Sequence, residues 1–347
     1  MAYTTIKKPS DYFRTKLYQG NSTDNTTITW DETDTNFGSN LFLWLKARDL
    51  VGGAGQEHWL TDSVRGASKF LESNATYAES DVGGNFAYTT NGFVLDNNAR
   101  TNRGSMVGWS WNTSGSASSN TDGSITSTVS ANTTSGFSIV SWTGTGANAT
   151  VGHGLGSIPK MIIVKRRSGA DPWRVQHGSL GSQYHLILNE TNASATGTNV
   201  WNDTEPTSSV FTIGTDRAVN GSGDTFIAYC FADVKGFSKF GSYTGNGNAD
   251  GTFVYTGFKP AFLMIKCFDN ARSWVMWDTK RNPYNLSTYG LLADTNDTEN
   301  SGYDVDLLSN GFKLRTTGSG ENGSGFNYIY MAFAEEPLVG DNPATAR

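Results

Sequence analysis

The chain contains one stretch of sequence twice, about 100 residues apart. Gly136 to Gly146 reads GFSIVSWTGTG, and Gly236 to Gly247 reads GFSKFGSYTGNG. Both are followed by a proline and an apolar segment that reaches a lysine, SIPKMIIVK in one copy and FKPAFLMIK in the other. Such a repeat indicates that one structural unit is written more than once, and it restricts the fold more than any local pattern does.

The register between the copies continues beyond these segments. Trp173 corresponds to Trp274 and His177 to Asp278, and each copy closes with a glycine turn and an aromatic strand, NGSGDTFIAYCFAD and NGSGFNYIYMAFAE. The first hundred residues contain a more diverged copy, with YFRTKLYQGN as the opening strand and NLFLWLKARD as the lysine strand. We therefore predict three units of about 100 residues each.

The predicted organisation follows from these copies and from composition. It comprises an N-terminal attachment segment (1–11), unit 1 (12–112), a Ser/Thr/Gly-rich linker (113–135), unit 2 (136–235), unit 3 (236–337) and a C-terminal tail (338–347).

Each unit has the pattern of a β-sandwich. Short aromatic and β-branched segments alternate with Gly, Asn and Asp turns roughly every 8 to 15 residues. We predict an all-β fold of three tandem sandwiches, jelly-roll or lectin-like, with little helix. In the last strand Tyr328 and Tyr330 alternate with Ile329 and Phe333, so both faces are expected to be covered.

The net charge and the hydropathy of the chain argue against nucleic-acid binding, export and membrane insertion. The net charge is -6, and the longest basic run is Lys165 to Arg167, so no nucleic-acid partner is expected. The start, MAYTTIKKPSDYF, has no apolar signal region, and no run of 18 apolar residues occurs, so neither export nor membrane insertion is predicted. Cys230 and Cys267 lie in apolar runs and are expected to be buried free thiols.

No catalytic, cofactor or metal site is predicted. The four histidines lack zinc-ligand spacing, and His177 corresponds to aspartates, Asp62 and Asp278, in the other copies. The acidic residues near the end of the chain are interpreted as solvated turn residues and not as a glycosidase pair: Asp294, Asp297, Glu299, Asp304 and Asp306. A calcium site in this loop is an alternative, although the EF-hand spacing is absent.

Aromatic residues outside the repeat are the candidates for a recognition surface, because an indole or phenol ring offers an apolar face with a polar edge. We predict receptor or glycan contacts for Trp201, Trp277, Tyr284 and Tyr289. Trp173 and Trp274 are repeated, and they are expected in the core.

Longer segments resemble a known group of proteins. TTSGFSIVSWTGTGANATVGHGLGSIPKMIIVKRR, GFSKFGSYTGNGNADGTFVYTGFKPAF and NYIYMAFAEEP resemble virion structural proteins of marine tailed phages, cyanophage-like or pelagiphage-like, that are described as tail-fibre proteins. The resemblance extends over essentially the whole chain. It implies a virion protein assembled in the host cytoplasm, a homotrimer, an N-terminal region bound to another virion protein, and distal units that contact a host-surface glycan or protein.

The leading hypothesis is therefore a non-enzymatic tail-fibre component that recognises the host surface. Two alternatives stay open: a capsid-decorating or vertex-fibre protein, and a carbohydrate-active enzyme with a lectin-like sandwich.

Overall fold

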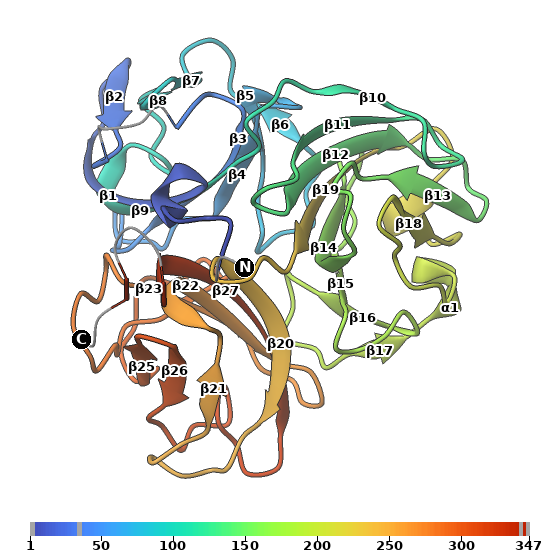
Figure 1. Cartoon of the computed structure of the whole chain (residues 1–347). Coiled ribbons are helices and arrows are strands. Elements are labelled where there is room, and N and C mark those ends of the chain that lie inside the picture. Colours follow the sequence, from blue (N-terminus) through green and yellow to red (C-terminus); the bar gives the residue numbers. More distant parts are fainter. Residues whose placement is uncertain (1–3, 33–36, 340–342, 345–347) are drawn as a thin grey trace.

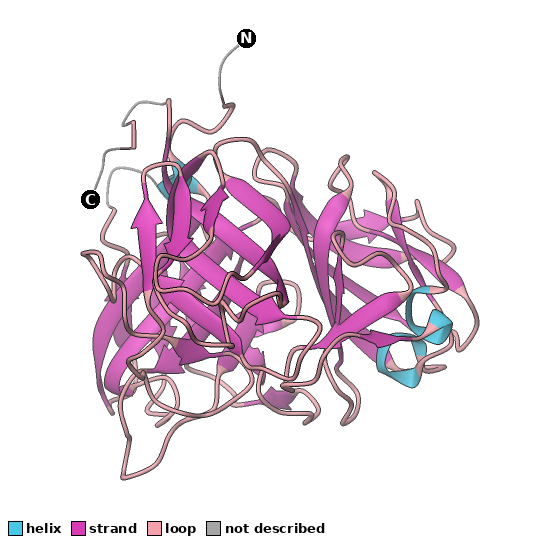
Figure 2. Cartoon of the chain, turned by 90° about the horizontal axis from the view of Figure 1, so that it is seen from below, coloured by secondary structure: helices cyan, strands magenta, loops and turns pink. Residues whose placement is uncertain are grey.

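The computed structural model describes residues 4–32, 37–339 and 343–344. Within them the regular structure is almost entirely antiparallel β-sheet, with a 3-10 helix η1 (Pro9–Asp11) and two four-residue α-helices, α1 (Thr198–Trp201) and α2 (Arg217–Asn220) (Figure 2). The all-β prediction is confirmed. Positions 1–3, 340–342 and 345–347, which belong to the predicted attachment segment and tail, lie outside the described residues.

The first group of strands, called unit 1 below, forms a six-stranded and a three-stranded sheet. The large sheet has the order β1 (Phe13–Asn21), β9 (Arg103–Asn112), β3 (Leu41–Ala47), β4 (Trp59–Asp62), β5 (Gly66–Leu71) and β6 (Ser80–Asp81). The small sheet has the order β2 (Thr26–Thr29), β8 (Gly92–Leu95) and β7 (Ala87–Thr89).

The second group, unit 2, forms an eight-stranded and a two-stranded sheet. The large sheet has the order β10 (Ser118–Asn120), β11 (Ser127–Asn132), β12 (Phe137–Thr143), β19 (Thr225–Ala232), β14 (Pro159–Arg166), β15 (Arg174–His177), β16 (Tyr184–Ile187) and β17 (Ala195–Thr196). The small sheet consists of β13 (Ala149–Gly152) and β18 (Val210–Ile213).

The third group, unit 3, forms a five-stranded and a three-stranded sheet. The large sheet has the order β20 (Ser238–Thr244), β27 (Asn327–Pro337), β22 (Phe258–Cys267), β23 (Trp274–Asp278) and β24 (Leu291–Leu292). The small sheet has the order β21 (Phe253–Tyr255), β26 (Gly311–Leu314) and β25 (Val305–Leu308).

One strand order recurs in the three large sheets. It reads β1-β9-β3-β4-β5, then β12-β19-β14-β15-β16, then β20-β27-β22-β23-β24. In two units a proline lies at or near the start of the lysine strand, Pro159 as the first residue of β14 and Pro260 as the third of β22. The pairing register shifts at each, as expected for a residue that cannot donate to the ladder.

The prediction that residues 113–135 form a linker is wrong. It contains β10 and β11, and β11 pairs with β12 over five residues, from Thr128 to Asn132. Val129 contributes to the core of unit 2, which polar composition alone did not reveal. The Ser and Thr residues of this segment therefore belong to an edge of the sheet.

The three groups of sheets surround a common centre (Figure 1). Trp111 of β9, Phe231 of β19 and Phe333 of β27 meet there, with ring centroids 5.5 to 6.0 Å apart and edge-to-face geometry. The opposite face of β27 packs within its own sandwich, where Tyr330 contacts Phe312. Both faces of the closing strand are therefore covered inside one chain.

We expect Trp111→Ala to lower the free energy of unfolding by about 3 to 5 kcal/mol, because it opens a cavity where all three units meet. Urea denaturation followed by circular dichroism measures the change. The control is Tyr255→Ala, at an exposed ring, with an expected effect within about 0.5 kcal/mol. Equal effects of the two substitutions would contradict the central packing.

Candidate functional site

Three buried lysines connect the units in a ring. Each lies at the same place in its lysine strand and donates from Nζ to a backbone carbonyl of a neighbouring unit: Lys46 to Asn296 (3.1 Å), Lys165 to Thr76 (3.0 Å) and Lys266 to Thr191 (2.7 Å). Unit 1 thus donates to unit 3, unit 3 to unit 2, and unit 2 to unit 1. All three side chains are buried, and burial lowers the pKa of each lysine to about 8.

A second set of hydrogen bonds follows the same direction around the ring. Trp173 Nε1 donates to Glu72 O (2.8 Å), and Trp274 Nε1 donates to Ile187 O (2.9 Å). Both tryptophans are buried, as predicted. His58 takes the corresponding place in unit 1: its Nδ1 accepts from Trp44 Nε1, so its Nε2 donates to Leu292 O (2.8 Å).

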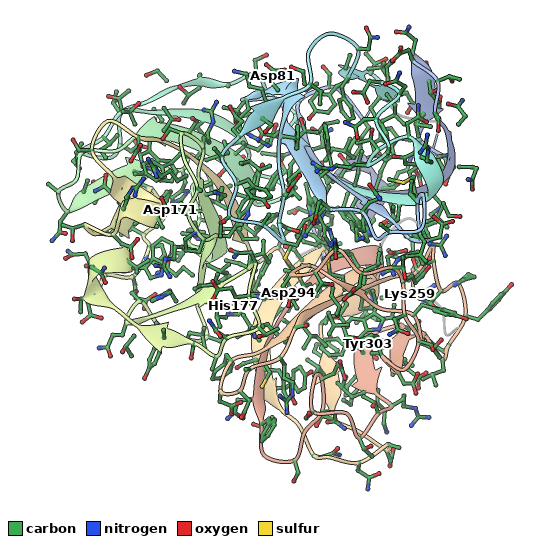
Figure 3. All side chains as sticks on the ribbon, turned by 180° about the vertical axis from the view of Figure 1, so that it is seen from behind. Asp81, Asp171, His177, Lys259, Asp294 and Tyr303 are labelled. Carbon is green, nitrogen blue, oxygen red and sulfur yellow. The ribbon has the colours of Figure 1, made fainter. Side chains whose placement is uncertain are left out.

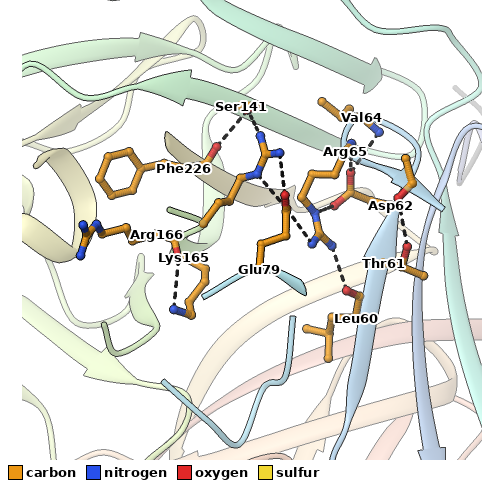
Figure 4. Close-up of polar contacts among 12 residues, drawn as sticks. Leu60, Thr61, Asp62, Val64, Arg65, Glu79, Ser141, Lys165, Arg166 and Phe226 are labelled. Atoms are coloured by element: carbon orange, nitrogen blue, oxygen red, sulfur yellow. Dashed lines mark hydrogen bonds and ion pairs between the residues drawn. The ribbon is translucent and has the colours of Figure 1, made fainter. Parts of the chain in front are cut away.

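Ion pairs occupy the space between neighbouring large sheets. Asp62 pairs with Arg65, which also contacts Glu79, and Glu79 accepts two hydrogen bonds of 2.9 Å from Arg167 of unit 2 (Figure 4). Tyr229 of unit 2 donates to Asp62 Oδ2 (2.9 Å). The residues Asp278, Arg281, Glu299 and Arg48 repeat this arrangement between units 3 and 1.

His177 stands where the other units have Asp62 and Asp278. All three residues pair with the same position of the neighbouring lysine strand: His177 with Met161, Asp62 with Phe42, and Asp278 with Phe262. His177 Nε2 lies 3.3 Å from Tyr330 O, and burial lowers the pKa of the ring to about 4. The three side chains therefore all hold neighbouring sheets together.

A polar cavity of about 410 Å³ opens where loops of the three units converge, and we call it the axial pocket. Three of its lining residues, Asn74, Asn189 and Asp294, occupy corresponding positions. Each side chain accepts a backbone N–H at the start of the strand that follows the lysine strand, from His58, Trp173 and Trp274 respectively. Figure 3 shows Asp294 near the middle of the molecule. The complete lining is Glu57, Asn74, Ala75, Thr76, Tyr77, Asn189, Asp294, Thr295 and Asn296.

Asp294 is the least satisfied group in this pocket. It is only 8% exposed, and Oδ1 accepts from Trp274 N, whereas the buried Oδ2 has no hydrogen-bond partner. Burial raises the pKa of Asp294 above its usual value. The interpretation of Asp294 as a solvated turn residue is therefore wrong. The Nδ2 group of Asn189, which is half-buried in the same lining, also has no hydrogen-bond partner among the described residues.

The N-terminal segment lies at the other end of the strands from the axial pocket. Lys266 pairs with Ile329, whereas η1 and Lys8 line a cavity of about 340 Å³ together with Ala334 and Glu336. Ile329 and Glu336 are seven residues apart in β27, which corresponds to about 23 Å along the strand.

The four predicted recognition residues divide into two pairs. Trp201 and Trp277 are fully buried, Trp201 in the core of unit 2 and Trp277 in that of unit 3, so their prediction as surface contacts is wrong. Absence from the repeat had suggested exposure, but each ring fills its own sandwich. Tyr284 (80% exposed) and Tyr289 (48% exposed) lie on the loop between β23 and β24, away from the axial pocket lining.

Sequence reasoning missed Tyr77, which is 66% exposed at the rim of the axial pocket. The corresponding residues in the other units are Asn192 and Asp297, so Tyr77 is an aromatic residue outside the repeat. The criterion that selected Tyr284 would also have selected it.

Two other acidic residues of the predicted loop form ion pairs, Glu299 with Arg48 and Asp306 with Arg315, whereas Asp297 is exposed. Among the described residues, no group of three or more His, Cys, Asp or Glu side chains is placed to hold a metal ion. Cys230 and Cys267 are buried free thiols, as predicted. None of the described helices has the length and apolarity that crossing a membrane would require.

A family model covers residues 8–337 of this chain in one match, and that family is described as Domain of unknown function (DUF7483). The chain belongs to the DUF7483 family. The matched range begins before β1 and ends with β27, so the match includes all three units. No curated protein matches the chain.

Stability is expected to rise between pH 8 and 9. The folded lysines have a pKa of about 8 against 10.5 when unfolded, so the unfolded state binds more protons in this window and each lysine adds about 1 kcal/mol. The two cysteines, whose pKa burial raises, oppose this rise as pH approaches 9.

Comparing variants isolates the lysine contribution. In urea titrations at pH 8 and 9, Lys266→Met should reduce the rise by about 1 kcal/mol. Lys239→Met, at a side chain that is 42% exposed, should leave it unchanged. An undiminished rise in Lys266→Met would show that Lys266 does not titrate in this range.

Proposed function

We propose that this protein is a non-enzymatic structural component of a phage virion, and that it recognises the host surface as part of a tail fibre. The resemblance of its sequence to marine phage virion proteins supports the virion assignment. The observation that carries the recognition role is the placement of the N-terminal segment and the axial pocket at opposite ends of the strands. Attachment at one end leaves the other end free to meet a host cell.

The N-terminal end offers a formed surface to a neighbouring virion protein. Ile6 is buried in the central core, η1 packs against β27, and Gly236 lies against Thr4. The partner virion protein would therefore bind a folded face, with Lys8, Glu32, Lys280 and Glu336 around its cavity.

The homotrimer proposal depends on the resemblance alone. The aromatic faces of the closing strands, which a trimer partner could have covered, are covered by units of the same chain. The residues that meet there are Trp111, Phe231 and Phe333. A trimer of this chain would use other surfaces.

Labelling intact particles with antibodies to this chain, followed by electron microscopy, tests the proposal. We expect label on the distal part of the tail, with particles from an unrelated phage as the control. Label confined to the head would favour the capsid-decorating or vertex-fibre alternative and would contradict the tail-fibre proposal.

A further inference from the structure

We propose that the axial pocket binds a neutral sugar residue at the end of a glycan, held between the ring of Tyr77 and the polar groups of Asn189 and Asp294. This inference deepens the proposed function, because it names the ligand class and the residues of host recognition.

The ring of Tyr77 suits the apolar face of a sugar. It is 66% exposed at the rim of a cavity whose other lining residues are mostly polar. An exposed ring at such a place gives no core packing, whereas it can cover the C–H face of a pyranose while the phenol edge stays in water.

The polar groups suit hydroxyl groups, which donate and accept. Asp294 Oδ2 is a buried acceptor without a partner, and leaving such an atom unpaired costs free energy. Neighbouring atoms almost wholly cover Oδ2, so a sugar hydroxyl reaches it once the carboxylate rotates toward the pocket. Asn189 Nδ2 is a donor without a partner among the described residues. One sugar carries enough adjacent hydroxyl groups to satisfy both atoms.

A metal ion fits the same pocket poorly. The carbonyl oxygens of Thr76 and Asn296, which a hard cation would need, already accept from Lys165 and Lys46. Glu57 accepts from Asn74 and Asn296. The lysine ammonium groups also repel a cation, just as the carboxylates of Glu57 and Asp294 repel an anion. A neutral ligand is therefore favoured.

The internal repeat supplies a substitution that preserves the fold. Asn occupies the position of Asp294 in both other units, where Asn74 and Asn189 accept the corresponding backbone N–H. Asp294→Asn should therefore keep the bond from Trp274 N and replace only the unpaired acceptor. Tyr77→Ala removes a ring that is 66% exposed, and Tyr284→Ala is the control at a ring outside the pocket that is 80% exposed.

The test is binding of methyl glycosides of glucose, galactose, mannose and N-acetylglucosamine to the full chain, by saturation-transfer and titration NMR. A ligand of this size is expected to bind with a Kd of about 1 mM. Tyr77→Ala and Asp294→Asn should each weaken binding about tenfold or more, and Tyr284→Ala should leave it unchanged. The methyl glycosides mimic a glycan terminus, and the reducing sugars in a second arm reveal a preference for free sugar.

Three results would overturn the inference. They are no binding of any glycoside at concentrations well above the expected Kd, binding that neither variant weakens, and a calcium chloride titration that shifts pocket resonances while the glycosides do not. Release of sugar from an oligosaccharide would indicate the enzyme alternative. Antibody label on the tail together with no glycoside binding would contradict sugar binding in the axial pocket and support the proposed function. Label on the head together with glycoside binding would contradict the tail-fibre proposal and support sugar binding in the pocket.

Discussion

The structure depends on three buried lysines that no unit can satisfy alone. Lys46, Lys165 and Lys266 lose their hydration on folding, and none of the described carboxylates forms an ion pair with them. Carbonyl oxygens must therefore replace the lost water. In each case one of those carbonyls belongs to the next unit. A unit separated from its neighbours would expose its lysine, its indole or imidazole donor and its part of the central aromatic cluster together. This interdependence agrees with a family model that covers 8–337 in one match.

Much of the fold could be predicted from the sequence, because local residue patterns within each unit agree with the strands and turns that form. The lysine strands, the closing aromatic strands, the buried Trp173 and Trp274 and the free cysteines all follow from period-2 alternation, turn residues and repetition. The ring of contacts was not visible, because Lys165 and Thr76 are 89 residues apart and no local pattern records their pairing. The polar segment 113–135 hid two strands, since an edge strand needs few apolar residues.

The candidate site was predicted less well than the fold. Absence from the repeat correctly marked Tyr284 and Tyr289 as exposed, but it failed for Trp201 and Trp277, because a ring can differ between units and still fill a core. The axial pocket combines residues that repeat between the units with residues that occur in one unit only. Asn74, Asn189 and Asp294 repeat, whereas Tyr77 and the charge of Asp294 occur once, so a shared scaffold gains an asymmetric ligand surface at its centre.

Differential scanning calorimetry of the full chain tests most directly whether the three units are one cooperative structure. Closure through the lysine ring predicts a single transition, with a calorimetric enthalpy equal to the van't Hoff enthalpy. Two or three separate transitions, each with the enthalpy expected of about 100 residues, would contradict the account, because they would show that the units fold and unfold independently.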